Sequence, residues 1–483
     1  MTSALSLPDR EQALAHAASL ILDSWRTFDH ARPGQPLLDA RHRALLTGPL
    51  PADGSDARAA LTLAAEVLDA SISQPRPRYL AYVGSSGLEI GVLGDALAAA
   101  HDINVAVAAG GADLFERQAI RWVAEFTGFG TPADGMLAAG GTISNLTALA
   151  AARERALPGF RHSGGDGRRM ALYCSADAHY SVRRAAEVLA IGGRQVRALP
   201  VDEERRLRPD ALAAAIAADV RAGIVPVAVV ATGGTTLTGA VDALEPIAAV
   251  CAEHGVWLHV DGAYGLPAAA TASAGALFAG LERADSATVD AHKWLAVPKA
   301  CSVLLVRDGA TLERTFSHHE SYIPHGELAE LHPVDRTLEY SRPLRALKLW
   351  LAFTVHGADA FRVAIERNLA QARTLARLLS EHPRFELLHE PQLSAVCFRH
   401  VSCPDAAATA ALVRAIERDG RILLAAAELD GRSCLRACFV NHRTTDEDVE
   451  AVVEVVDEVA GGLVGGASAG AADARGADAG AAR

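Results

Sequence analysis

The segment from residue 227 to 260 constrains the fold of this chain more than any other. Val227-Ala228-Val229-Val230-Ala231 is an uninterrupted apolar run, typical of a strand that is buried on both faces. Residues 243–254 have the pattern of a helix, Gly255 ends it, and residues 256–260 form a second apolar run. Two such runs joined by a helix predict a βαβ unit, and therefore an α/β fold with a mostly parallel sheet and helices on both faces.

Size and composition fit a globular protein with a large core. The chain has 483 residues, of which 50% are hydrophobic and 22% charged. A net charge of −12 and the lack of a Lys/Arg-rich block argue against nucleic-acid binding. The sequence contains no run of about 18 apolar residues, so it predicts no membrane span. Residues 1–10 lack the apolar core of a signal peptide. Seven scattered cysteines without a CxxC pair predict reduced thiols and a cytoplasmic protein.

A lysine follows another strand of the predicted sheet. The short apolar run of residues 287–290 leads to His292 and Lys293. A lysine at the end of a buried strand is costly unless it has a partner or a chemical role. It is either a side chain that reaches solvent just past the strand, or an amine in an apolar pocket that bonds to the aldehyde of pyridoxal 5′-phosphate (PLP). We interpret Lys293 as the residue that holds PLP.

An aspartate ends the strand of residues 256–260. Asp261 would lie at the carboxyl end of a buried parallel strand, where an acid needs a partner. That partner is either a set of loop amides or the pyridinium nitrogen of PLP. Because Asp261 and Lys293 follow consecutive strands, we expect both at the same edge of the sheet.

Two further segments have the features of a ligand site at that edge. Residues 135–145 are a Gly-rich turn before a helix at 146–155, and the free N–H groups of such a helix start bind phosphate. Thr142 or Ser144 is equally suited to a simple N-cap. His179 follows a strand over residues 170–175, where a histidine either faces a ligand or lies at the surface as a cap.

The remaining segments predict the architecture around this site. Residues 79–87 form either a linker or a loop at a substrate entrance. Residues 316–327 hold three histidines without the spacing of a metal site, so we predict no metal and a mobile loop over the site. The predicted divisions are an N-terminal helical segment (1–75) that packs on the main domain or on a partner subunit, a large PLP-binding domain (76–350), a small C-terminal domain (351–460) and a disordered tail (461–483).

Several of these motifs, in this order, resemble the group II PLP-dependent amino-acid decarboxylases, the family of the aromatic-L-amino-acid, histidine and glutamate decarboxylases. The resemblance runs from about residue 75 to residue 450. The motifs that carry it are Gly140-Gly141-Thr142-Ile143-Ser144-Asn145, Ala178-His179-Tyr180-Ser181, His259-Val260-Asp261-Gly262-Ala263-Tyr264-Gly265, Asp290-Ala291-His292-Lys293-Trp294, the segment 340–350, Cys434-Leu435-Arg436, Asn441 and Thr444.

The resemblance implies the fold of the fold-type I PLP-dependent transferases, similar to aspartate aminotransferase, and a homodimer with active sites at the subunit interface. It implies that Lys293 carries PLP, that Asp261 pairs with the pyridine nitrogen and that His179 stacks on the ring and orients the substrate. Tyr322 matches a tyrosine that enters the neighbouring subunit's site as a proton donor. The other implied cofactor contacts are Thr142, Ser144 and His292 at the phosphate, Thr235 and Ala263 beside the ring, and Ile143 and Asp290.

The implied reaction is decarboxylation of an L-amino acid to a primary amine and carbon dioxide. An aldehyde synthase or another lyase on the same fold is the alternative. A non-enzymatic relative would be expected to lose Lys293 or Asp261, and this chain keeps both. Aromatic substrates are the first expectation for this family. However, the loop Val83-Gly84-Ser85-Ser86-Gly87 differs from the bulkier, Pro-containing loop of aromatic-acid decarboxylases, which leaves room for a branched aliphatic acid such as valine or leucine.

Overall fold

The computed structural model describes residue 7 and residues 9–32, 34, 39–71, 74–106, 110–164, 167–318 and 333–478. Its helices are α1 (Arg10–Phe28), α2 (Ala40–Leu46), α3 (Ala57–Asp69), α4 (Glu89–His101), α5 (Gly111–Thr127), α6 (Gly141–Ala156), α7 (Phe160–Ser163), α8 (Ser181–Val188), α9 (Pro209–Arg221), α10 (Leu244–His254), α11 (Ala310–Phe316), α12 (Ala346–Glu381), α13 (Ala406–Asp419) and α14 (Asp446–Asp478). Its strands are β1 (Asp134–Ala138), β2 (Met170–Ser175), β3 (Val196–Leu199), β4 (Val225–Thr232), β5 (Trp257–Asp261), β6 (Ser286–Val289), β7 (Ser302–Val306), β8 (Phe385–Leu387), β9 (Ala395–His400), β10 (Ala425–Leu429) and β11 (Arg432–Cys438).

The larger sheet has seven strands in the order β1-β7-β6-β5-β4-β2-β3. The strands β6, β5, β4, β2 and β3 are parallel to one another, whereas β7 runs antiparallel to β6 and β1. The predicted βαβ unit is confirmed: α10 connects β4 to β5, and the two strands pair from Ala228↔Trp257 to Thr232↔Asp261. The carboxyl ends of the parallel strands therefore meet at one edge of the sheet.

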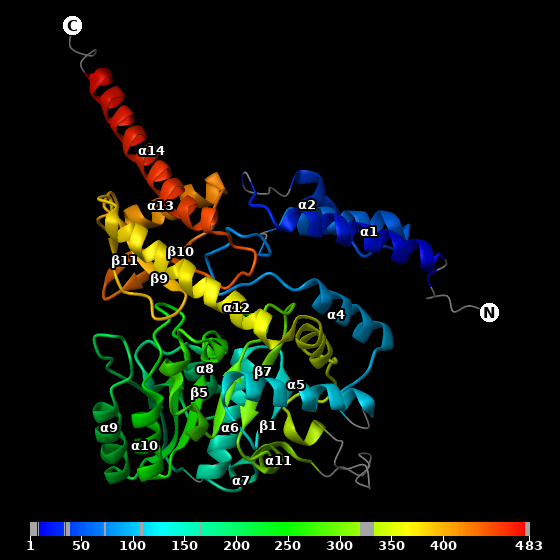
Figure 1. Ribbon diagram of the computed structural model, residues 1–483, viewed down its shortest axis with the longest axis vertical. Helices are drawn as coiled ribbons and strands as arrows, with labels where there is room; N and C mark the ends of the chain where they lie inside the picture. The colour runs from blue at the N-terminus through cyan, green and yellow to red at the C-terminus, as the bar shows by residue number, and fades with distance from the viewer. Residues whose placement is uncertain are drawn as a thin grey trace.

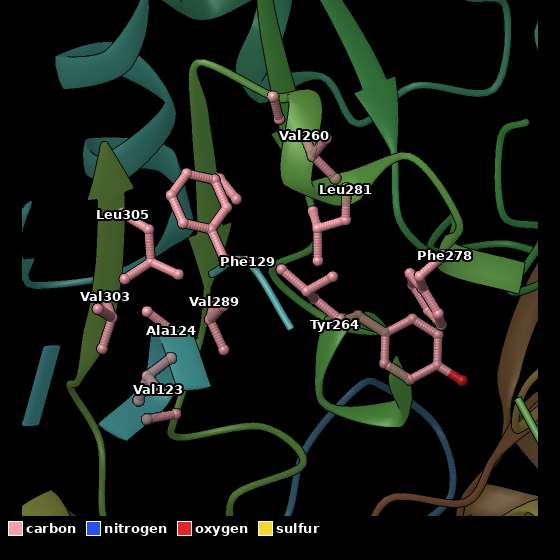
Figure 2. Close-up of a cluster of buried hydrophobic side chains, with 14 of the residues drawn as sticks. Val123, Ala124, Phe129, Val260, Tyr264, Phe278, Leu281, Val289, Val303 and Leu305 are labelled. Carbon is pink, nitrogen blue, oxygen red and sulfur yellow. The ribbon is translucent and has the colours of Figure 1, made fainter. Parts of the chain in front are cut away.

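Helices cover both faces of this sheet. One face packs on α5, α9, α10 and α12, and Figure 2 shows part of this core, with Val123 of α5 near Val289, Val303 and Leu305 of the sheet. The other face packs on α6 and α8. Side chains of a strand alternate between faces, so Leu258 and Val260 enter the first core while Trp257 enters the second. The α/β fold with a mostly parallel sheet is confirmed.

A second sheet and its helices form the upper body in Figure 1. This sheet is antiparallel, with the order β10-β11-β9-β8, and it packs with α13 and α14 in a separate hydrophobic core. The small C-terminal α+β domain expected from the sequence is therefore present. The predicted division at residues 350–351 falls inside α12, which crosses from one body to the other (Figure 1). A backbone change at Gly357 (φ 73°) bends this helix between its two halves.

Both ends of the described chain are helical. The N-terminal segment is helical, as expected, and α1 packs on α3 in an arm at the upper right of Figure 1. At the other end α14 continues to Asp478, across residues that composition predicts to be a disordered tail. Alanine, the strongest helix former, is frequent there, but glycine, one of the weakest, is equally frequent, so composition alone does not explain the helical backbone. None of the helices within the described residues is long and apolar enough to cross a membrane.

Candidate active site

A cavity of about 410 Å³ opens at the carboxyl edge of the large sheet. Turns that follow β1, β2, β4, β5 and β6 all contribute to its wall. This is the place where open α/β sheets bind ligands. Its lining residues are Ala139, Gly140, Gly141, Thr142, Ile143, Asn145, His179, Thr232, Gly234, Thr236, Asp261, Ala263, Tyr264, Asp290, His292, Lys293, Lys299 and Ala300.

Lys293 lies in the turn after β6, with its side chain partly exposed to the cavity. Its Nζ is 3.1 Å from Oδ2 of Asp290, which is itself buried. The other oxygen of Asp290, Oδ1, is buried without a hydrogen-bond partner in the described protein. A buried carboxylate oxygen without a donor is costly, so this side of the cavity is suited to a ligand that brings a proton donor.

Asp261 lies at the end of β5, the strand next to β6. Its Oδ2 accepts a hydrogen bond from Asn145 Nδ2 at 2.8 Å, and its Oδ1 accepts one from the backbone N–H of Ala263 at 3.2 Å. The expectation that Asp261 and Lys293 share one sheet edge is confirmed. The sequence left open loop amides or a ligand as partners of Asp261, and the structure shows a loop amide and a side-chain amide while the carboxylate still lines the cavity.

The phosphate-type helix start is the N-terminus of α6. The helix begins at Gly141, earlier than the sequence predicts, and Ile143 and Ser144 donate their N–H groups to Gly140 O. The N–H groups of Gly141 and Thr142 lie in the first turn, before the intrahelical bonds begin. A Cβ on Gly141 would lie 3.0 Å from Asp290 Oδ2, so only glycine lets the helix start approach this carboxylate so closely.

Two of the hydroxyls expected at the cofactor point elsewhere. Ser144 bonds through Oγ to Ser302 Oγ of β7 at 2.8 Å and does not line the cavity. Thr235 is buried and bonds to Thr238 Oγ1 at 3.0 Å, so its hydroxyl holds its own loop together. Thr232, which the sequence reading did not single out, lines the cavity with a buried Oγ1 that has no partner in the described protein.

His179 and His292 both line the cavity. Burial lowers the pKa of His179, and the nearby Asp261 opposes that shift. Nδ1 of His292 donates to the carbonyl oxygen of Cys301 at 2.9 Å, which places Nε2 on the side of Asp290, 3.8 Å from its Oδ2. Burial also lowers the pKa of His292. Burial thus favours the neutral form of both rings, and the nearby carboxylates Asp261 and Asp290 oppose this shift.

Several site predictions have a different outcome or remain predictions. Tyr322 lies outside the described residues, as does most of the expected mobile loop. Among the residues that the structure describes, no three His, Cys, Asp or Glu side chains are grouped as metal ligands. Asn145, Thr232 and Lys299 are lining residues that sequence reasoning missed. The position of Asn145 in the first turns of the phosphate-type helix was the available signal for one of them.

The fold and the cavity together define a class. A lysine and a buried aspartate follow neighbouring parallel strands, and a helix N-terminus faces them, in the α/β fold of the fold-type I PLP-dependent enzymes. A family model described as the pyridoxal-dependent decarboxylase conserved domain matches residues 63–401. The chain belongs to the pyridoxal-dependent decarboxylase family.

Comparisons with known proteins agree with this assignment. The chain is similar to an aromatic-L-amino-acid decarboxylase from Bacillus atrophaeus, with 33% identity over 94% of this chain and 96% of that protein. It is 34% identical to cysteine sulfinic acid decarboxylase from Rattus norvegicus over 59% of each chain. The solved structure of mouse CSAD in its apo form superposes with a TM-score of 0.86 at 25% identity, covering 93% of this chain and 98% of the other. The chain is thus a PLP-dependent carboxy-lyase.

The residues of the cavity fit PLP. Lys293 offers an amine to the aldehyde, Asp261 a carboxylate to the ring nitrogen, and the start of α6 offers backbone N–H groups to the phosphate. The buried oxygens Asp290 Oδ1 and Thr232 Oγ1 lack partners in the described protein and would gain them from a bound polar group. The space is of the size that small-molecule sites occupy, roughly 300–1,000 Å³.

Proposed function

We propose that this protein removes the Cα carboxylate of an L-amino acid as carbon dioxide and releases the primary amine. One observation carries the proposal: Lys293 and Asp261 lie in one cavity at the ends of adjacent strands β6 and β5. Bound PLP supplies the sink for the electrons left at Cα. The side chains around it decide which bond is broken and where the proton returns.

Each residue has a proposed role at a stated group. Lys293 holds the cofactor covalently, and Asp261 keeps a proton on the pyridine nitrogen. The first turn of α6 with Thr142, together with His292, binds the phosphate. His179, whose pKa burial lowers, stacks as a neutral ring and orients the substrate. Tyr322 is the proposed proton donor to Cα after carbon dioxide leaves. Ile143, Ala263 and Asp290 complete the contacts with the cofactor.

An apolar side chain, aromatic or branched, is the proposed substrate class. The similarity to an aromatic-L-amino-acid decarboxylase extends over nearly the whole chain, which supports this class. The small residues of the loop at 83–87 leave space for a branched side chain as well. The aldehyde synthase outcome is the alternative at the step after decarboxylation, and detection of ammonia and peroxide beside an aldehyde would identify it.

A second substrate class is favoured by one specific observation. Lys299 lines the cavity, and its Nζ bonds to the side-chain oxygen of Gln74. The side chain of Lys299 is exposed, and among the described residues it forms no ion pair with a carboxylate. An ammonium group at this place would pair with an acidic substrate side chain. Glutamate, aspartate and cysteine sulfinate therefore belong in the same screen.

We also propose that the protein is a homodimer with its sites at the subunit interface. The N-terminal arm exposes large apolar side chains, which a second subunit would cover. Among them are Leu14, Ile21, Leu45, Leu46 and Leu68. A cytoplasmic location is part of the proposal, because all seven cysteines are free and buried as thiols.

The test is a carbon dioxide release screen of the purified holoenzyme across the twenty amino acids and cysteine sulfinate. The proposal predicts release from at least one amino acid with a stoichiometric amount of primary amine. Release of carbon dioxide from none of them, by protein that has bound PLP, would contradict it.

A further inference from the structure

Behind Asp261, buried polar side chains form one continuous hydrogen-bonded series that the proposed mechanism does not yet use. Each member is at most 2% exposed, so water does not compete for these hydrogen bonds. The members are Trp257, Ser286, His259 and Asn145.

The direction of this series follows from its two ends. Trp257 Nε1 lies 2.8 Å from Ser286 Oγ, and an indole nitrogen can only donate. Ser286 therefore accepts from Trp257 and keeps its own hydrogen, and His259 Nδ1 lies 2.8 Å from the same oxygen. At the other end of the series the carboxylate of Asp261 only accepts, so Asn145 turns its amide nitrogen to Asp261 and its oxygen to His259 Nε2, which must donate. With its hydrogen on Nε2, a neutral His259 accepts from Ser286 at Nδ1. Burial lowers the pKa of His259 to about 4, which agrees with a neutral ring.

His259 in turn fixes the orientation of Asn145. Its Nε2 lies 3.0 Å from Asn145 Oδ1, so the histidine donates and the amide oxygen accepts. The amide nitrogen of Asn145 then faces the other way, 2.8 Å from Asp261 Oδ2 and 3.0 Å from Ser181 Oγ. The donor-only indole of Trp257 at one end and the acceptor-only carboxylate of Asp261 at the other are both satisfied when Asn145 presents its amide nitrogen to Asp261.

The sheet explains why these groups meet. Trp257, His259 and Asp261 alternate along β5 and so share the face that α6 covers. Ser286 is the register partner of His259 on β6. Asn145 lies in the second turn of α6, so one helix presents N–H groups at its start and an amide to the carboxylate.

We propose that Asn145, oriented by His259, is a positioning residue that holds Asp261 toward the pyridine nitrogen of bound PLP. This inference rests on the proposed role of Asp261. With Oδ2 bonded to Asn145 and Oδ1 to the N–H of Ala263, the carboxylate has hydrogen bonds to both oxygens that oppose its rotation. Leucine, similar in size to asparagine, would leave the carboxylate, His259 Nε2 and Ser181 Oγ without this partner.

The experiment compares Asn145→Leu, His259→Leu and His259→Gln with the wild-type holoenzyme. Glutamine can place its amide nitrogen near the position of His259 Nε2 and donate to Asn145. Gln371→Leu is the matched control: it removes another buried amide, which bonds to Thr444 O and Asn368 Nδ2. The readouts are the PLP dissociation constant, the absorption of bound PLP against pH, and kcat and KM for carbon dioxide release.

We expect Asn145→Leu to weaken PLP binding and to lower kcat, each by about 10- to 100-fold, the range for lost hydrogen bonds to a charged group. The pH at which the absorption of bound PLP changes should move down by about one unit, because a misplaced carboxylate stabilises the pyridinium less. His259→Leu should act in the same direction, His259→Gln should restore most of the effect, and Gln371→Leu should leave the pH profile unchanged.

An Asn145→Leu enzyme with the wild-type pH profile and PLP affinity would overturn the inference. So would equal effects of His259→Leu and His259→Gln. The outcome is distinguishable from failure of the proposed function: an enzyme that decarboxylates no amino acid still reports the role of Asn145 through the pH profile of its bound PLP.

Discussion

A Cβ added to Gly141 would lie 3.0 Å from Asp290 Oδ2 and 3.0 Å from Ala263 Cβ. The first turn of α6 therefore touches the carboxylate that pairs with Lys293, and the space between them is taken. A phosphate bound at the start of α6 would also have to lie close to the backbone of Gly141. Glycine at this position serves the geometry of the site rather than a backbone of positive φ.

Gly141→Ala should weaken PLP binding about tenfold or more, because the methyl group must displace Asp290 or the helix start from the cofactor. Titration of the apoenzyme with PLP, followed by absorbance, measures the change. Gly111→Ala is the matched control, since Gly111 is the first residue of α5 and its Cβ would meet nothing within 4 Å. Equal PLP affinities of the two variants would contradict this account of Gly141.

Lys299→Met should raise the preference for apolar over acidic substrates about tenfold, the size of one ion pair of roughly 1.4 kcal/mol. The ratio of kcat/KM values for leucine or phenylalanine over glutamate or cysteine sulfinate measures it. Lys299→Arg keeps the charge and is the control. A ratio that stays the same in Lys299→Met would remove Lys299 from the substrate's path.

Acid should destabilise the protein through His259. The pKa of His259 is about 4 in the folded protein and 6.5 in the unfolded chain. Between these pH values the unfolded chain therefore binds a proton that the folded chain does not. Stability is therefore lost as pH falls from 6.5 to about 4, by about 3 kcal/mol from this one group. Asp242 acts in the opposite direction, because burial raises its pKa to about 6.

The comparison with His259→Gln isolates the histidine, since Asp242 contributes equally to both proteins. The difference in the free energy of unfolding between wild type and variant, from urea titrations at fixed protein concentration, should shrink between pH 7 and pH 5. A difference that is the same at both pH values would show that His259 is not buried as a neutral ring.

Leu14→Glu or Ile21→Glu on the exposed face of α1 should weaken the proposed homodimer, because each places a charge in an apolar interface. Light scattering across a dilution series measures the oligomeric state, and activity should fall with dissociation if the sites lie at the interface. Val220→Glu, on an exposed position of α9, is the control. A chain that is monomeric and fully active without these changes would contradict the dimer.

Much of the site could be predicted from the sequence because its residues follow strands. Apolar runs of parallel strands are easy to recognise, and the residues after them meet at one edge whatever the loops do. Lys293, Asp261 and His179 were located in this way. The sequence predicts helix α6 too short because its start, Gly141-Thr142-Ile143-Ser144-Asn145, consists of residues with weak helix propensity.

The other differences come from contacts that no local pattern records. Ser144 points away from the cavity because Ser302, far along the chain, accepts or donates at its hydroxyl. Thr235 bonds within its own loop, while Thr232, three residues earlier, faces the cavity. The order Trp257, His259, Asp261 is visible in the sequence, but its meaning depends on the register of β5 with β6. Such pairings require the folded sheet.

The most direct test of the account is the covalent attachment of PLP to Lys293. Borohydride reduction of the holoenzyme, followed by proteolysis and mass spectrometry, should find the pyridoxyl group on the peptide that contains Lys293, and Lys293→Ala should lose both the attachment and carbon dioxide release. A fully active Lys293→Ala enzyme, or a pyridoxyl group on Lys299 instead, would contradict the account.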